Sequence, residues 1–282
     1  MALPPGFDLD SFVQSVLAED LGSGGDVTST ATIDADARFT ATMNSREPIV
    51  VAGMEIAAAF FAALDSEVSI QPSASDGDRV ETGGTLMRLA GNARAMLAAE
   101  RSALNTLQHL SGIATLTRRF VDAIEGTGAI VLDTRKTLPG LRLLEKYAAR
   151  MGGAQNHRLR LDDGVLIKDN HVAVCGDVSA AVKKAKAANT GLQVQVEVDR
   201  VEQIGPALAA GADRLLLDNM PPPILRDAVR LVAKRVPLEA SGGVNLETIR
   251  AIAETGVDYI SIGRITQSAP SVDIGLDYAT GR

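Results

Sequence analysis

Apolar positions in the first part of the chain recur with helical or strand-like spacing. One helical face is expected in residues 8–21, where the apolar positions are Leu9, Phe12, Val13, Val16, Leu17 and Leu21. Alternating positions and turn residues predict four more elements: a strand over 39–51, a short helix over 56–64, and strands at 67–70 and 85–89 that flank a hairpin turn at 76–84. The glycine-rich residues 22–29 are interpreted as a loop, because no Lys follows them as a P-loop requires.

Helical spacing then continues from residue 94 to residue 124. Its apolar positions are Leu97, Leu104, Leu107, Leu110, Ile113, Leu116, Phe120 and Ile124. This pattern predicts a long buried helical stretch, or two helices that meet near Gly112. The other face carries Arg101, Asn105 and Gln108. That polar stripe is either solvated or faces a site, and Arg101 is a candidate anion ligand.

Beyond residue 128 a strand-plus-helix unit repeats. Short apolar runs end at Asp133, Lys168, Glu197, Asp218, Ser241 and Gly263, and the last four ends are 21, 23 and 22 residues apart. Helical segments are expected between them at 178–188, 201–210, 224–232 and 246–254. This alternation is the signature of parallel β/α architecture. The residues at the strand ends should therefore converge on one rim.

Composition limits the classes of protein that fit. A length of 282 residues with 46% hydrophobic and 22% charged residues is typical of one large or two ordinary globular domains. The single cysteine, Cys175, excludes an internal disulfide and is expected to be a small buried residue in a reducing compartment. A net charge of −7 and 3% aromatic residues argue against a nucleic-acid or anionic-membrane partner. The N-terminus lacks the basic region of a signal peptide, and the longest apolar run is broken by Glu55, so a cytoplasmic protein is expected.

Basic residues and imidazoles nevertheless gather in residues 131–172. The cluster consists of Arg135, Lys136, His157, Arg158, Lys168 and His171. A solvated basic face is the ordinary explanation for such residues. These side chains, however, follow apolar runs that are expected to be buried strands, and α/β proteins bind ligands at the carboxyl ends of strands. An anion-binding pocket is therefore favoured.

The remaining strand ends suggest a metal site and a phosphate site. Glu197 and Asp218 end consecutive strands, and neighbouring strands lie roughly 4.8 Å apart, so the two carboxylates suit a Mg²⁺ ion or acid–base chemistry. Ser241-Gly-Gly precedes an expected helix, and with Gly263 it matches the phosphate position of β/α barrels. The ligands implied are a phosphorylated sugar with additional negative charge and a second anionic substrate. These residues alone do not distinguish a lyase, an isomerase or a transferase.

Several segments closely resemble one family, end to end and in order. They are Glu100-Arg-Ser-Ala-Leu-Asn, Gln108-His-Leu-Ser-Gly-Ile-Ala-Thr, Asp133-Thr-Arg-Lys-Thr-Leu-Pro-Gly, Asn156-His-Arg, Leu166-Ile-Lys-Asp-Asn-His, Glu197-Val-Asp, Leu217-Asp-Asn-Met, Glu239-Ala-Ser-Gly-Gly and Gly256-Val-Asp-Tyr-Ile. The family is quinolinate phosphoribosyltransferase, also called nicotinate-nucleotide pyrophosphorylase (carboxylating), of NAD biosynthesis. The resemblance implies an N-terminal α/β sandwich domain over 1–112, completed by 270–282, and an incomplete α/β barrel over 113–269.

The resemblance also implies a reaction. The family transfers phosphoribosyl from phosphoribosyl pyrophosphate to quinolinate with Mg²⁺, and decarboxylation yields nicotinate mononucleotide, pyrophosphate and CO₂. A homodimer or an assembly of dimers is expected, with sites between subunits.

Residue roles follow from the same resemblance. The quinolinate carboxylates would be held by Arg101, Arg135, His157, Arg158 and Lys168, and Thr134 would also contact substrate. Lys136 and Lys168 would face pyrophosphate, and Glu197 and Asp218 would serve the metal and the ribose hydroxyls. The 5-phosphate would be held by Ser241, Gly242, Gly243 and Gly263. Lys136, Lys168, Glu197 and Asp218 are the expected catalytic residues.

Two histidines and one glutamine are left out of the expected site residues. Gln267 stands where many bacterial relatives carry histidine, and its neutral amide brings no positive charge. His109 and His171 are expected to be structural or to support residues that contact the substrate, because a buried histidine satisfied by hydrogen bonds is commoner than a catalytic one.

Three rival functions are compatible with the same residues. A molybdenum-transport-associated paralogue would share the fold, and a nicotinate phosphoribosyltransferase would act on a monocarboxylate. A non-catalytic phosphosugar-binding module is the third. The several cationic groups favour a dicarboxylate acceptor, because Arg matches carboxylates bidentately, and the Glu197/Asp218 pair favours retained chemistry.

Overall fold

The protein is described by a computed structural model covering residues 3–279, and its contacts divide the chain into two units. The first unit comprises residues 1–116, 143–152 and 268–282, and the second comprises 117–142 and 153–267. The predicted domain limits at 112/113 and 269/270 stay predictions. The ends of the predicted first domain, residues 1–2 and 280–282, lie outside the described residues.

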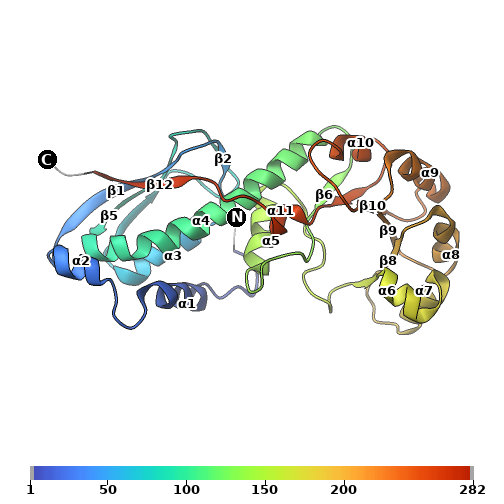
Figure 1. The fold of residues 1–282 in the computed structure, drawn as a ribbon, viewed down its shortest axis with the longest axis horizontal. Helices are drawn as coiled ribbons and strands as arrows, with labels where there is room; N and C mark the ends of the chain where they lie inside the picture. The colour runs from blue at the N-terminus through green and yellow to red at the C-terminus, as the bar shows by residue number, and fades with distance from the viewer. Residues whose placement is uncertain (1–2, 280–282) are drawn as a thin grey trace. The chain divides into compact units, whose positions relative to one another are not determined.

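The first unit is built on an antiparallel sheet with the strand order β12-β1-β5-β3. Its strands are β1 (Arg38–Ser45), β3 (Ser69–Pro72), β5 (Thr85–Asn92) and β12 (Ile274–Ala279). A separate pair consists of β2 (Ile49–Val50) and β4 (Arg79–Val80). In Figure 1 the red β12 lies beside the blue β1, so residues from opposite ends of the chain share one sheet. The predicted strand over 39–51 is interrupted, because residues 46–48 pair with neither sheet.

Helices α1 (Leu9–Leu21), α2 (Val27–Thr32) and α3 (Met54–Leu64) also belong to the first unit. Helix α1 begins where the Asp8 carboxylate accepts a hydrogen bond from the Ser11 main-chain N–H at 3.0 Å, which satisfies one of the free donors of the first turn. Asp26 caps α2 in the same way through Ser29. Helix α2 therefore starts inside the stretch predicted as a loop.

Helix α4 (Ala93–Ala123) is a single helix, so the alternative of two helices meeting near Gly112 is wrong. Gly112 is required because the backbone of Pro270 approaches the helix closely at this position. A Cβ on Gly112 would stand 2.1 Å from the main-chain oxygen of Pro270. The glycine accommodates a neighbouring backbone without ending the helix.

Helix α5 (Arg142–Met151) was not predicted, because it carries buried polar residues that hide its apolar face. Two of them contact side chains of other segments. His109 Nε2 lies 3.0 Å from Glu145 Oε1, and Tyr147 donates a hydrogen bond of 2.6 Å to Asp76. His109 therefore has the structural contact that the sequence predicted.

The second unit is a six-stranded parallel sheet with the order β6-β11-β10-β9-β8-β7. All six predicted apolar runs are strands: β6 (Ile130–Leu132), β7 (Val165–Ile167), β8 (Val194–Val198), β9 (Arg214–Asp218), β10 (Leu238–Ser241) and β11 (Tyr259–Ser261). Central residues such as Val196, Leu215 and Ile260 have no exposed surface, which explains their near-continuous apolar sequence. Together with the intervening helices this is the predicted incomplete α/β barrel.

The helices of the second unit follow the strands along the chain. They are α6 (Asp169–Cys175), α7 (Val178–Ala187), the 3₁₀ turn η1 (Val201–Gln203), α8 (Ile204–Ala209), α9 (Pro222–Val232), α10 (Ile249–Ala253) and α11 (Arg264–Gln267). Helix α10 is shorter than the predicted 246–254, because Asn245 and Thr248 form a hydrogen-bonded turn before it. Cys175, predicted to be buried, is only half-buried at the end of α6. Among residues 3–279, no helix has the length and apolar character needed to cross a membrane.

Candidate active site

A cavity of about 850 Å³ lies at the carboxyl ends of the second unit's strands. Twelve of the thirteen predicted site residues line it: Thr134, Arg135, Lys136, His157, Arg158, Lys168, Glu197, Asp218, Ser241, Gly242, Gly243 and Gly263. The remaining one, Arg101, is exposed on α4 in the first unit and does not line this cavity. The parallel sheet thus assembles residues separated by more than a hundred positions in the sequence.

The loop after β6 is fixed by its own hydrogen bonds. The Lys136 main-chain N–H donates to Thr134 Oγ1 at 3.0 Å, and Thr266 Oγ1 donates to the Lys136 carbonyl at 2.7 Å. These contacts hold the backbone on both sides of Arg135. Thr134 therefore shapes the loop that presents the two cationic side chains.

Two guanidinium groups face the same cavity. Burial lowers the pKa of Arg158, and the positive charge of Arg135 lowers it further. Arg158 Nη1 donates to the Gly164 carbonyl at 2.9 Å, which fixes part of its side chain. Two like charges that repel each other favour an anion between them.

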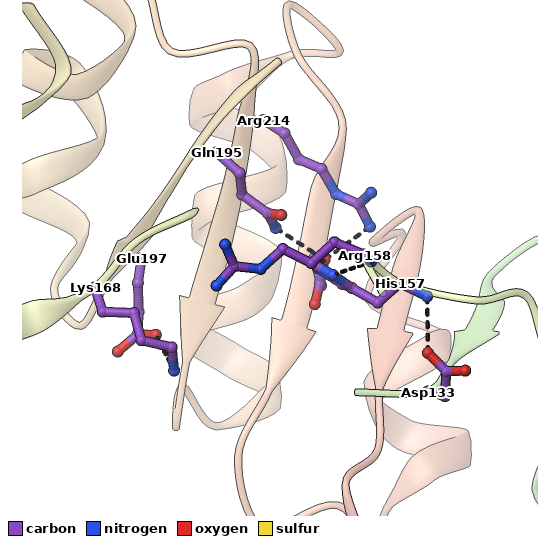
Figure 2. Close-up of polar contacts among 8 residues, drawn as sticks. Asp133, His157, Arg158, Lys168, Gln195, Glu197 and Arg214 are labelled. Atoms are coloured by element: carbon purple, nitrogen blue, oxygen red, sulfur yellow. Dashed lines mark hydrogen bonds and ion pairs between the residues drawn. The ribbon is translucent and has the colours of Figure 1, made fainter. Parts of the chain in front are cut away.

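Lys168 and two carboxylates form a second charged group. Lys168 Nζ lies 3.5 Å from Glu197 Oε2 (Figure 2). Burial raises the pKa of the Glu197 carboxyl; the Lys168 charge opposes this rise, and the negative charge of Asp218 adds to it. A cation between Glu197 and Asp218 would relieve their repulsion.

A glycine turn follows β10 beside Asp218. Gly242 and Gly243 have φ values of +97° and +60°, a conformation that favours glycine. A Cβ on Gly242 would meet Asn219 Oδ1 at 2.1 Å, so side chain and backbone are in contact there. Asn219 in turn donates to Asp218 Oδ2 at 2.6 Å. The phosphate-type turn and the carboxylate are therefore joined through Asn219.

The predicted anion site at a helix N-terminus is corrected by this geometry. Helix α10 begins at Ile249, eight residues after Ser241, and has five residues. The cavity is lined instead by the turn of Gly242 and Gly243.

The cavity lining also includes polar residues that the sequence analysis did not assign to the site, among them Asn219 and Glu239. Glu239 stands two positions before Ser241 on β10, and residues two apart on a strand share a face. This two-residue spacing from Ser241 could have indicated that Glu239 faces the site. His171 accepts a hydrogen bond of 3.0 Å from the Lys168 main-chain N–H, but its side chain is exposed and not buried as predicted.

Comparison with known proteins is consistent across both units. Residues 26–111 match the N-terminal domain model, and residues 113–277 the C-terminal domain model, of quinolinate phosphoribosyl transferase. A nicotinate-nucleotide pyrophosphorylase (carboxylating) from Mycobacterium leprae is 45% identical, with 94% of this chain and 95% of the relative covered. A probable enzyme of the same name from Bacillus subtilis is 42% identical, with 95% and 93% covered.

A solved structure shows the same fold. The nicotinate-nucleotide pyrophosphorylase of Francisella tularensis superposes with a TM-score of 0.92 at 38% identity, covering 99% of this chain and all of that one. The family models, the relatives and the solved structure all indicate the same family. The chain belongs to the quinolinate phosphoribosyltransferase family.

Proposed function

We propose that the cavity of the second unit is the site at which this family member carries out its reaction. The reaction is that of a decarboxylating quinolinate phosphoribosyltransferase in NAD biosynthesis. Phosphoribosyl passes from phosphoribosyl pyrophosphate to quinolinate, and nicotinate mononucleotide, pyrophosphate and CO₂ are formed. The observation that carries the placement is the convergence of two guanidiniums, two carboxylates and a glycine turn in one cavity.

The acceptor half of the site is assigned to Arg135, Arg158, Lys168 and His157. Quinolinate carries two carboxylates, and Arg and Lys supply the positive charge that they require. The mutual repulsion of Arg135 and Arg158 supports this assignment, because a dianion bound between them removes it.

The phosphoribosyl half is assigned to the opposite group of strand ends. The 5-phosphate would lie against Ser241, Gly242, Gly243 and Gly263, whose main chain can approach an anion closely. Lys136 extends across Gly263 and would face the phosphate or pyrophosphate groups. Lys168 would do the same from the other side, while its ammonium remains near Glu197.

Glu197 and Asp218 fit a Mg²⁺ ion, since hard oxygen ligands are those it prefers. The fit is supported by the raised pKa of Glu197, which burial causes and the charge of Asp218 increases. No group of three or more potential ligand residues occurs among residues 3–279, so the other ligands would be water and substrate oxygens. A bound Mg²⁺ would offset the charge of the pyrophosphate group.

Orientation and charge compensation are the tasks left to the protein. The pyridine nitrogen of quinolinate would attack C1 of the ribose, and pyrophosphate would leave with the electron pair of the broken bond. Glu197 and Asp218 favour the positive charge that develops on the ribose. Departure of CO₂ leaves its electron pair on the ring carbon, beside the alkylated nitrogen, and a proton completes the product.

We expect the functional assembly to be a homodimer or an assembly of dimers with sites shared between subunits. The family resemblance supports this arrangement, as does the exposed position of Arg101 on α4. Mixing Arg101→Ala protein with Arg135→Ala protein after reversible dissociation tests it. In an equal mixture about half of the dimers would be mixed, and one of the two sites in each would be intact. Shared sites would therefore restore activity to about a quarter of the parent's. No recovery in verified mixed dimers would contradict shared sites. A cytoplasmic location stays a prediction of the sequence.

A single assay tests the acceptor. The purified protein is incubated with phosphoribosyl pyrophosphate, Mg²⁺ and either quinolinate or nicotinate, and nicotinate mononucleotide and CO₂ are measured. Product from quinolinate alone is expected. Product from nicotinate alone would contradict the dicarboxylate assignment, and omission of Mg²⁺ with a chelator present tests the metal.

A further inference from the structure

Glu239 is a fully buried carboxylate beneath the cavity, and the mechanism above does not use it. Its exposed fraction is 0%, although it borders the space that the substrates would occupy. It lies on β10 two residues before Ser241, so its side chain is on the same face of the sheet. A buried carboxylate is costly unless it is paired and hydrogen-bonded, and its partners therefore indicate its role.

Three side chains converge on this carboxylate from neighbouring segments. Arg214 Nη2 lies 2.8 Å from Glu239 Oε2, and Gln195 Nε2 donates to the same oxygen at 2.8 Å. His157 Nε2 lies 3.4 Å away. Figure 2 shows Gln195, Arg214 and His157 reaching toward one point between the strands.

The charge of Glu239 is already compensated without His157. The Arg214 guanidinium lies 3.9 Å above the ring centroid of Tyr259 and pairs with the carboxylate. The carboxylate is therefore ionised beside one permanent positive charge, and the buried pair is neutral as a whole.

The protonation of His157 follows from its other ring nitrogen. The Arg158 main-chain N–H donates to His157 Nδ1 at 2.8 Å, so that nitrogen must present a lone pair and cannot carry a proton. The single proton of a neutral imidazole then lies on Nε2, which faces Glu239. The main chain of His157 is held as well, because its N–H donates to Asp133 Oδ1 at 2.8 Å (Figure 2).

We propose that Glu239 is a positioning residue of the acceptor site that holds His157 as a neutral Nε2–H imidazole. His157 then ties the Arg158 backbone to the interior of the sheet, and it brings no positive charge to the substrate. The positive charge that binds the acceptor comes from Arg135, Arg158 and Lys168. This inference rests on the proposed placement of quinolinate beside those residues, and it goes beyond that placement by assigning a tautomer and a buried support.

Nuclear magnetic resonance of ¹⁵N-histidine-labelled protein tests the tautomer directly. The chain has three histidines, and the signals of His157 are assigned by their loss in His157→Asn protein. At neutral pH we expect one unprotonated nitrogen, Nδ1, and one protonated nitrogen, Nε2. Two protonated nitrogens, or a proton on Nδ1, would overturn the proposal. This readout needs no turnover, so it remains decisive even if the assay with quinolinate fails.

Kinetics of Glu239→Gln test the positioning role. The amide removes the negative charge that pairs with Arg214 and puts an NH₂ donor in place of one carboxylate oxygen, so the contacts with Arg214, Gln195 and His157 should weaken. We expect the KM for quinolinate to rise about tenfold, the size associated with one charged hydrogen bond, while the KM for phosphoribosyl pyrophosphate changes less than about twofold. Glu239→Asp keeps the charge and should recover part of the loss.

The matched control is Glu202→Gln, the same substitution at an exposed position of the same unit. It should leave both KM values unchanged. A folded Glu239→Gln protein with the kinetics of the control would contradict the proposal, as would equal increases in both KM values. If Glu239→Gln does not fold, Glu239→Asp is compared with the control in its place. Parent-like KM values together with parent-like His157 signals in Glu239→Asp would also contradict the proposal.

Discussion

Lys136 lies across Gly263, and a Cβ at position 263 would stand 2.6 Å from Lys136 Cδ. The Lys136 carbonyl is fixed at the same place by Thr266 Oγ1 at 2.7 Å. The backbone therefore cannot shift to make room, and the lysine side chain must move instead. Gly263 is needed for the path of Lys136, in addition to its proposed contact with a phosphate.

Gly263→Ala should accordingly lower kcat/KM by about tenfold or more, since displacement of a positioned group by about 1 Å can cost a hundredfold. The fold should survive, because the obstructed atoms belong to one side chain. A double-mutant cycle with Lys136→Ala is the measurement. If the two losses are fully additive, the glycine does not act through Lys136.

Arg135→Ala should abolish detectable turnover on quinolinate while leaving the fold intact. Removal of one guanidinium takes away charged hydrogen bonds to a carboxylate, a loss of about a hundredfold or more. Far-ultraviolet circular dichroism and turnover are measured together. Loss of the folded signal would show that Arg135 is structural.

Glu197→Ala and Asp218→Ala should each weaken Mg²⁺-dependent activity. Both carboxylates line the cavity, and the metal would lose an oxygen ligand in either variant. Titration of activity with Mg²⁺ should show a higher half-saturating concentration than in the parent. Unchanged kinetics in both variants would remove these residues from the site.

The raised pKa of Glu197 also predicts a pH dependence of stability. Burial is the main cause of the rise. A carboxyl with a higher pKa in the folded state favours folding at low pH, and this contribution is lost as the pH rises through the folded-state value. Glu197→Gln cannot ionise, so without Mg²⁺ the Tm of the variant relative to the parent should rise between pH 4 and pH 7, a range that begins below the usual pKa of about 4.3. Parallel Tm curves would contradict the shift.

Gly112→Ala tests the close approach inside helix α4. Alanine favours a helix interior by up to about 1 kcal/mol, but here its methyl would collide with the Pro270 backbone, at a cost of about 1–3 kcal/mol. We expect net destabilisation in urea unfolding. Asn105→Ala is the control, because Asn105 is exposed on the same helix and alanine is the better helix former, so it should be neutral or stabilising. Equal effects would show that the Pro270 contact is unimportant.

Local pattern was sufficient for most of the second unit. Six apolar runs became the six parallel strands, because a strand covered on both faces needs apolar residues along its whole length. Arg135, Lys168 and Glu197 lie at or just after the ends of strands, so their convergence follows from that topology. His157 and Arg158 instead lie before β7, next to the bridge from Gln155 to Leu132, and only the structure places them in the same cavity.

Local pattern failed where a distant backbone or a buried charge decides the structure. Gly112 lies inside helix α4 because the backbone of Pro270, more than 150 residues later, packs against it and leaves no room for a side chain. Helix α5 hides in the sequence because its buried Glu145 and Tyr147 find partners on other elements. Neither partner is visible from the spacing of nearby residues.

The sequence by itself determined which strand ends carry charged, polar or glycine residues, since strands are recognised from the local hydrophobic pattern. Only the tertiary structure decided how they are supported. Glu239 contacts Gln195, Arg214 and His157 through pairings of separate strands and a loop. Whether two side chains form a hydrogen bond depends on differences of a few tenths of an ångström in their separation. Those separations are set only when the whole sheet has packed.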